Sequence, residues 1–325
     1  MTSSTDISIG KLLGRSLELA DEAHVASAQT KLGNLRAGNS GVLLPGGVVA
    51  GDCHRKAHLR TLDLEVDPPN LSRKIMFAGG NLNEIWWLDT LRKTWPGVVL
   101  AEDEIPVTWT LPSGHVVSGR PDVVLCDAEK KPVLLLELKS VASLWTAKDV
   151  AFAGAPKLPN LAQAAHYMWQ LGDIPGRLVY TNYTQYVVPS WGNKQFASRP
   201  ELTTVKPGKG KSPDYVTVNP FVVIYELRFG VGGFLEFREE DSDAEWIPSI
   251  ITKERIHDFY VAADALATSQ ELGGIPATLD YAGDKKNYSN CSYCPLEDIC
   301  HSSGRESTHY GRWIGAVRER LGRKD

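Results

Sequence analysis

Two apolar segments joined by a polar turn constrain the fold of this 325-residue chain more than any other feature. Residues Val116–Cys126 and Pro132–Ser140 are rich in valine and leucine, and the residues between them, 127–131, are polar. This pattern predicts an antiparallel hairpin. Because side chains alternate along a strand, Glu137 and Lys139 are expected to share one face of the second strand, with Leu136 and Leu138 on the other.

The second strand ends in charged residues although its first half is apolar. The run Val133–Leu136 predicts a central, buried strand, in which a carboxylate and an ammonium group are costly to desolvate without partners. A divalent metal held by Asp122 and Glu137 would compensate these charges, and oxygen ligands suit Mg²⁺ or Mn²⁺. Lys139 would then orient or deprotonate the attacking water. The alternative interpretation is a surface hairpin that simply ends in charges.

The pair Pro121-Asp122 and Glu137-Leu138-Lys139 is similar to the two named motifs of the PD-(D/E)XK nuclease superfamily. This resemblance implies an α/β fold with a restriction-endonuclease-like core, in which helices flank a central mixed sheet. It also implies a metal-dependent deoxyribonuclease, with Asp122 and Glu137 as metal ligands and Lys139 as a catalytic residue.

A helix is predicted downstream, over Asn160–Tyr167. Asn160 is placed to cap it, and Gln163 would complete a capping box. Gln163 and Tyr167 lie four residues apart and so share a helix face. They resemble the Gln-x-x-x-Tyr helix of the RecB-like branch, which implies that both contact the catalytic lysine and the DNA. Glutamine and tyrosine at this spacing also occur by coincidence.

Upstream, Phe77–Glu84 leads into an amphipathic run, Ile85–Trp95. The RecB-like pattern has a glycine, then a metal-binding histidine four residues later, then a glutamate. Gly79 and Glu84 match, but Asn83 stands in the histidine position. Asparagine is a poor ligand for transition metals, so the departure favours an oxygen-only site. Glu84 is a candidate helix-borne ligand, and a solvated glutamate in a first helical turn is the alternative.

Cysteines form a second constellation. Cys291, Cys294 and Cys300 are separated by two and five residues, and Cys53 is a distant fourth candidate. Four thiolates can bind zinc or an iron–sulfur cluster. The arrangement resembles the iron–sulfur branch of RecB-like nucleases, which includes the AddB nuclease domain and CRISPR-associated spacer-processing exonucleases. The resemblance implies a 4Fe–4S cluster, with zinc or unligated structural cysteines as alternatives. His54 replaces a proline common in that branch, and Cys126 is expected to be a buried apolar side chain.

The net charge of -4 argues against a protein that coats DNA passively. Two segments are nevertheless basic: Pro189–Asp214 has five Lys or Arg against two acids, and His301–Asp325 has six against three. Both could meet phosphates, and solvated loops are the alternative. No apolar run is long enough to span a bilayer, and the N-terminus lacks a signal-peptide pattern. These features predict a cytoplasmic protein without membrane contact.

Four segments are predicted: an N-terminal helical segment with Cys53 (1–70), the nuclease core (71–190), a basic loop with hairpin and helix (191–270), and the cysteine segment with a basic tail (271–325). The cluster would join the N- and C-terminal segments as an appendage. Within these segments, we expect helices at Ile9–Arg36 and Ile251–Thr268, a turn region at Asn39–Asp52, a strand at Gly176–Val188, and a hairpin of Val216–Phe229 with Gly233–Arg238.

The resemblance implies a metal-dependent DNA nuclease, and specifically an exonuclease acting on single strands or ends. Its process would be DNA recombination, repair, phage replication or CRISPR adaptation, with a protein partner in recombination or adaptation. A different class remains open, suggested by Asn83: a weakly active or inactive DNA-binding or assembly module that retains the nuclease fold and the cluster.

Overall fold

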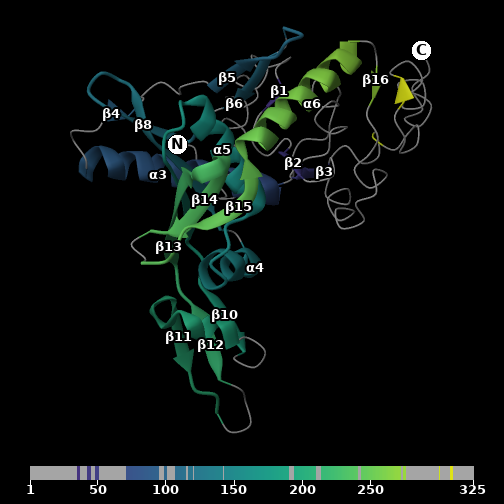
Figure 1. Cartoon of the computed structure of the whole chain (residues 1–325). Coiled ribbons are helices and arrows are strands. Elements are labelled where there is room, and N and C mark those ends of the chain that lie inside the picture. Colours follow the sequence, from purple (N-terminus) through teal and green to yellow (C-terminus); the bar gives the residue numbers. More distant parts are fainter. Residues whose placement is uncertain are drawn as a thin grey trace, which may run out of the picture.

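Figure 1 shows the computed structural model of the chain. The structure describes residues 35–36, 42–44, 48–50, 71–94, 99–100, 107–114, 116–119, 121–141, 143–189, 194–209, 214–240, 243–271, 274–275, 300 and 308–309.

A seven-stranded mixed sheet lies at the centre, in the order β15-β14-β13-β9-β8-β7-β4. β8 and β9 are parallel, whereas the other neighbouring strands are antiparallel. The strands are β4 (Val99–Leu100), β7 (Val123–Cys126), β8 (Pro132–Ser140), β9 (Gly176–Asn182), β13 (Phe221–Phe229), β14 (Phe234–Glu239) and β15 (Ile247–Thr252). The predicted mixed α/β architecture is therefore confirmed.

Helices cover both faces of the sheet. Leu91 of α3 (Leu71–Thr94) packs in one apolar cluster with Leu136 and Leu138 of β8. Leu161 and Tyr167 of α5 (Leu158–Gln170) belong to the larger cluster on the other face, which also contains Leu135. The alternation of β8 thus directs Leu136 and Leu138 toward α3, and leaves Glu137 and Lys139 on the α5 side.

The predicted hairpin is confirmed only for the part in which residues 123–126 pair with residues 132–136. Asp127 and Lys131 close the turn between β7 and β8, and Lys130 takes a left-handed conformation there, with φ of 63°. The first strand is not continuous, because Pro121 has no N–H to donate to a strand ladder. Residues before it form β6 (Val116–Gly119), which joins a separate sheet in the order β1-β6-β5, with β1 (Leu35–Arg36) and β5 (Val107–Thr110).

The helix boundaries also differ from the predictions. α5 begins at Leu158, with Lys157 at its N-cap and Pro159 in its first turn, a position that proline favours. The predicted cap and capping box at Asn160 are therefore wrong, and Asn160 Nδ2 donates to Tyr180 Oη at 2.9 Å instead. α3 starts at Leu71, so Glu84 lies in the middle of a 24-residue helix rather than in its first turn.

A small sheet projects away from the core at the bottom of the view in Figure 1. It contains β10 (Tyr186–Pro189), β12 (Tyr215–Val218) and β11 (Thr203–Lys206), in that order. The predicted strand Gly176–Val188 is therefore divided into β9 and β10. Likewise Pro220, which cannot donate to a ladder, separates β12 from β13 within the predicted Val216–Phe229 strand.

The elements predicted after residue 229 agree better with the structure. Gly232 and Gly233, with φ of 79° and 75°, make the predicted turn between β13 and β14. The helix expected over Ile251–Thr268 is α6 (Lys253–Glu271), since Ile251 and Thr252 end β15. β13, β14 and β15 extend the sheet that holds β7, β8 and β9. The predicted boundary at residue 190 therefore does not separate two sheets.

The remaining described elements are short. At the N-terminus, Leu35 and Arg36 form a strand where the end of a helix was predicted, and residues 9–34 lie outside the described part. β2 (Val42–Leu44) and β3 (Val48–Ala50) pair as a hairpin within the predicted turn region. The others are α4 (Leu144–Ala147), the π-helix η1 (Lys148–Phe152), the 3₁₀ turns η2 (Lys194–Ser198), η3 (Pro200–Leu202) and η4 (Val231–Gly233), and the pair β16 (Gly274–Ile275) with β17 (Thr308–His309).

Within the described ranges, no helix combines the length and apolarity needed to cross a bilayer.

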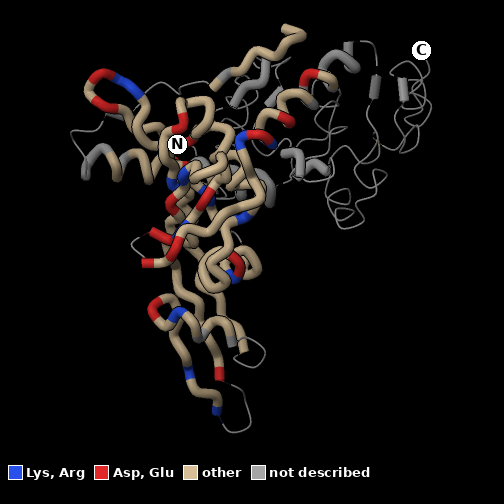
Figure 2. Tube along the Cα trace, in the orientation of Figure 1, with Lys and Arg blue, Asp and Glu red and all other residues tan. Residues whose placement is uncertain are grey.

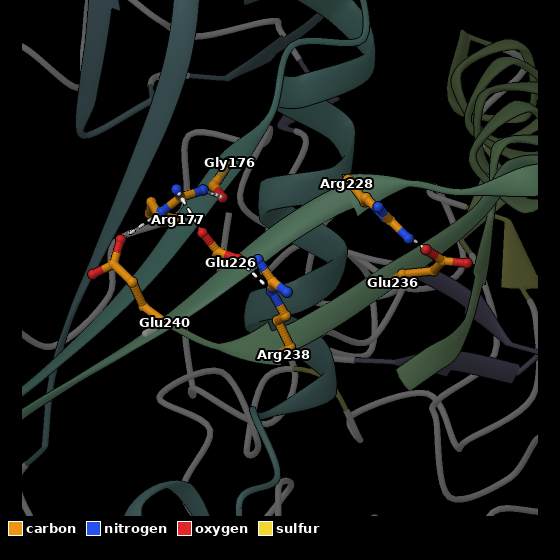
Figure 3. A network of polar contacts seen from close by, with 7 residues as sticks. All are labelled: Gly176, Arg177, Glu226, Arg228, Glu236, Arg238 and Glu240. Atoms are coloured by element: carbon orange, nitrogen blue, oxygen red, sulfur yellow. Dashed lines mark hydrogen bonds and ion pairs between the residues drawn. The ribbon is translucent and has the colours of Figure 1, made fainter. Parts of the chain in front are cut away.

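An ion-pair ladder crosses β9, β13 and β14 (Figure 3), on the same sheet face as Leu136 of β8, which lies opposite Arg177 in the register. Glu226 pairs with Arg177 at 2.8 Å and with Arg238 at 2.5 Å. Arg177 also pairs with Glu240 at 2.8 Å. The carboxylate oxygens of Glu226 are each engaged by a guanidinium group, so this part of the sheet carries paired charges.

Candidate metal site

Glu137 and Lys139 lie at the carboxyl end of β8, facing α5. The Glu137 side chain is fully buried, and Lys139 Nζ donates to its Oε1 at 2.5 Å. A buried carboxylate in a central strand needs such a partner, because desolvation otherwise disfavours its charge. The prediction that these two residues share a face is confirmed by their direct contact.

Asp122 precedes β7 and reaches across the hairpin to β8. Its Oδ2 accepts the backbone N–H of Leu138 at 2.7 Å, and Lys139 Nζ is 4.0 Å from the same oxygen. The Asp122 side chain is 24% exposed and that of Lys139 is 19% exposed. The two carboxylates therefore flank one ammonium group, in a site that is dry at Glu137 and reached by solvent at Asp122.

α5 carries two further predicted site residues, Gln163 and Tyr167, on the face of the sheet that holds Glu137. Tyr167 is buried, and Gln163 Nε2 lies 3.4 Å from its hydroxyl oxygen. Burial, followed by the charge of Glu137, raises the pKa of Tyr167 to about 12. The phenol consequently stays protonated at neutral pH, close enough to Glu137 to respond to its charge.

The electrostatics of the acidic residues and the lysine are strongly coupled. Burial raises the pKa of Glu137 to about 8, although Lys139 opposes the shift. Burial lowers the pKa of Lys139, but the carboxylates of Glu137 and Asp122 outweigh this and raise it to about 12. The ammonium therefore keeps its proton at neutral pH, and Glu137 is poised to gain or lose one.

Two buried oxygens of this site have no hydrogen-bond partner among the described residues: Glu137 Oε2 and Gln163 Oε1. Gln163 Oε1 can only accept a hydrogen bond, and so can Glu137 Oε2 when Glu137 is ionised. When Glu137 is protonated, its carboxyl group can share a hydrogen bond with Asp122, which contributes to its raised pKa. An unsatisfied buried acceptor costs about 1–3 kcal/mol. A divalent cation with oxygen ligands would remove that cost, so these residues fit Mg²⁺ or Mn²⁺.

The predicted third ligand, Glu84, is not brought into this group. In the part of the chain that the structure describes, no three His, Cys, Asp or Glu side chains lie close enough to hold a metal ion together. Glu84 belongs to α3, which packs on the sheet face opposite Glu137. Its neighbour Asn83 is buried, and its Oδ1 accepts a hydrogen bond from the Tyr183 hydroxyl.

The cysteine predictions remain largely beyond the described residues, since Cys53, Cys291 and Cys294 lie outside them. Cys300 is buried. Cys126 is buried in β7, as predicted, and burial raises the pKa of its thiol. A thiol of this kind behaves as a small apolar side chain.

The sequence interpretation missed Tyr180, which packs beside the site. In the parallel register it lies opposite Lys139, and its hydroxyl oxygen accepts hydrogen bonds from Asn160 Nδ2 and from the Lys157 N–H, both at 2.9 Å. It thereby fixes the start of α5 against β9. The available signal was its position in the apolar segment that follows the Gln163 helix.

Comparison of the chain with protein-family models finds no match, and comparison with curated proteins finds none either. Any functional assignment therefore depends on the motifs and on the geometry of this site.

Proposed function

We propose that this chain is a divalent-metal-dependent nuclease that hydrolyses phosphodiester bonds in DNA. The supporting observation is Glu137: a fully buried carboxyl group with one unpartnered oxygen, beside Lys139 and Asp122 at the end of a central strand. Their order along the hairpin matches the PD-(D/E)XK pattern, and the surrounding mixed sheet is compatible with that fold. Asp122 and Glu137 would hold the metal.

The bound metal would polarise the scissile phosphate and lower the pKa of its water. The chain's own residues have complementary tasks. Lys139 holds its proton at Nζ, so it serves better as a hydrogen-bond donor that orients the water or a phosphate oxygen than as a base. Asp122 is fixed by the Leu138 N–H, which keeps its carboxylate beside Glu137. The neutral phenol of Tyr167 can donate a hydrogen bond toward the same site.

Contact with DNA is supported by the basic segment near the projecting sheet. Lys206 and Lys209 are exposed there, and Figure 2 shows lysine or arginine positions along this sheet. Exposed lysines attract phosphates at long range without selecting a sequence. We propose DNA single strands or ends as the substrate, and an exonuclease that cleaves from the ends.

A second candidate is a DNA-binding or assembly module that cuts weakly or not at all. Two observations favour it: Asn83 is engaged by Tyr183, and no three-carboxylate group occurs among the described residues. This candidate keeps DNA binding but predicts little or no metal-dependent cleavage.

Cleavage of end-labelled DNA tests the proposal. Single- and double-stranded DNA carrying a 5′ or 3′ label should be degraded with Mg²⁺ or Mn²⁺ and left intact with a chelator. Asp122→Asn should abolish cleavage and retain DNA binding. Asp173→Asn is the matched control, because the Asp173 side chain pairs with Lys253 at 2.5 Å and is partly exposed. DNA binding without cleavage by the wild type would favour the second candidate, and cleavage by Asp122→Asn would refute the site.

The iron–sulfur cluster stays a prediction from the cysteine pattern. Protein purified without oxygen should contain about four irons per chain, as expected for a cluster held by four thiolates. Cys53→Ala should lose iron as Cys291→Ala does, and Cys126→Ser should retain it, because Cys126 is buried in β7. Zinc in place of iron would contradict this part of the proposal.

A further inference from the structure

Mg²⁺ and Mn²⁺ favour about six oxygen ligands, some of them water. The β7–β8 hairpin offers two side-chain carboxylates, Asp122 and Glu137, and the structure does not bring Glu84 to them. If the proposed function holds, further oxygens must come from water, from the DNA or from another element that packs against β8.

α5 is the element that packs against β8 on the Glu137 side. It presents Gln163 and Tyr167 on one face, and Tyr167 lies close enough to Glu137 for the carboxylate to raise its pKa. Gln163 in turn directs Nε2 toward the Tyr167 hydroxyl at 3.4 Å. Gln163 therefore contacts Tyr167, the α5 residue whose pKa responds to the charge of Glu137.

The orientation of the Gln163 amide separates its two polar atoms. With Nε2 toward Tyr167, the planar amide places Oε1 on the other side of its carbon. That oxygen is buried and has no partner among the described residues, which is also true of Glu137 Oε2. An amide oxygen is a hard ligand of the kind that Mg²⁺ and Mn²⁺ accept, and it adds no charge that Lys139 would have to balance.

We propose that Gln163 Oε1 is a ligand of the divalent cation, so that α5 rather than α3 supplies a third side-chain oxygen beside Asp122 and Glu137. This inference rests on the proposed function. It gives Gln163 a role different from that of a residue that only orients the lysine or the DNA. It also accounts for an amide at Gln163 with an unpartnered buried oxygen.

Mn²⁺ binding without DNA tests this ligand. Free Mn²⁺ is measured by electron paramagnetic resonance while the metal is titrated into the full chain. Gln163→Leu should weaken Mn²⁺ binding by at least about 10- to 100-fold, because that range is typical of residues that only orient a ligand and the loss of a ligand should cost no less. Gln163→Asn, which keeps the amide but shortens its reach, should also weaken it. Gln170→Leu is the matched control: Gln170 lies on the same helix and donates to the Tyr260 hydroxyl at 2.9 Å.

The outcomes separate this inference from the proposed function. If Mn²⁺ binds both Gln163 variants as tightly as the wild type while Glu137→Gln loses binding, Gln163 is not a ligand and the hairpin site stands. If Glu137→Gln also binds Mn²⁺ normally, the hairpin is not the metal site at all. Circular dichroism without metal checks the fold of each variant, and should Gln163→Leu not fold, Gln163→Asn decides the question.

Discussion

The two faces of the central sheet each carry a glutamate, and the two glutamates differ in burial and in partners: Glu137 is fully buried, whereas the Glu226 side chain is 13% exposed. On the face that α3 covers, the two carboxylate oxygens of Glu226 pair with Arg177 and Arg238 (Figure 3). On the α5 face, Glu137 pairs one oxygen with Lys139, and its other oxygen has no partner among the described residues. A fully paired network is sufficient for structure. The unpartnered oxygen of Glu137 is the observation on which the proposed metal site depends.

The two glutamates also differ in the charged groups that surround them. Glu226 lies between two permanently charged guanidinium groups, which occupy its oxygens in fixed geometry. Glu137 has a single ammonium partner, and Asp122 places a second carboxylate near that ammonium. When Glu137 is ionised, the α5 face has two carboxylates against one ammonium group, and burial makes this excess of negative charge costly, which is why the pKa of Glu137 is raised.

The largest expected difference between the two faces is in DNA cleavage. Glu137→Gln should lower the rate at least about a hundredfold, because removing one group that stabilises the transition state costs that much or more. Glu226→Gln should stay within about twofold, since its partners are structural arginines. The rates are compared on the same labelled DNA in Mn²⁺. Equal losses in the two variants would mean that overall stability, and not the metal site, governs cleavage.

Metal affinity should depend on pH through Glu137. Its pKa in the metal-free protein is raised to about 8, so below that value a metal must displace a proton. Apparent Mn²⁺ affinity should therefore fall by up to about tenfold for each pH unit below 8, a change of about 1.4 kcal/mol per unit. Calorimetric titration in buffers of different ionisation enthalpy measures both the affinity and the released proton. A pH-independent affinity would contradict the raised pKa.

The stability of the metal-free protein should also depend on pH through Glu137. Because the folded pKa of Glu137 is raised above its usual value, its contribution to stability is full at low pH and is lost as pH rises toward 8. Glu137→Gln cannot ionise, so it should gain stability relative to the wild type over this range, by a few kcal/mol. Glu226→Gln should instead lose about 1 kcal/mol through its broken ion pairs. Urea unfolding at several pH values measures both, and a flat difference for Glu137→Gln would be evidence against this account.

Replacing His166 should have the smallest effect on the protein. Stability should depend on pH through His166 in the opposite direction from Glu137. It is buried between α5 and α6, and burial lowers its pKa to about 3. Because the folded pKa lies below the unfolded value, stability falls as pH drops below about 6.5, by up to about 1.4 kcal/mol per unit. His166→Phe should remove this acid sensitivity without changing cleavage at neutral pH. Unfolding at pH 5.5 and 7.5 provides the comparison, and an unchanged slope would show that another group is responsible.

The local patterns of the sequence predicted local structure well. Alternation along β8 predicted which side chains share a face, and turn residues predicted the β7–β8 and β13–β14 connections, because both depend on neighbouring residues. Predictions failed where a proline ends an element, as at Pro121 and Pro220, or begins one, as at Pro159. At Pro121 and Pro220 the missing N–H outweighed the apolar pattern around it. At Pro159 the missing N–H costs nothing, because the first N–H groups of a helix have no partner within it.

Local sequence patterns did not predict which distant segments pair or pack with one another. The segment after residue 190 looked separate because a basic loop precedes it, yet β13 pairs with β9 and completes the central sheet. Glu84 matched a motif by spacing, but the packing of α3 against Leu136 and Leu138 places that helix on the other sheet face. Spacing along a chain does not specify which face of a sheet a helix will cover.

By itself, the sequence determined the identity of the charged residues at the end of β8, the face that Glu137 and Lys139 share, and the mixed α/β class. These follow from backbone geometry that acts over a few residues. Only the tertiary structure decided that Glu137 is wholly buried with one unpartnered oxygen, that Gln163 rather than Glu84 lies on its side of the sheet, and that Asn83 is held by Tyr183. Burial and partnership depend on elements far apart in the chain, because desolvation is set by everything that surrounds a group and not by its neighbours in sequence.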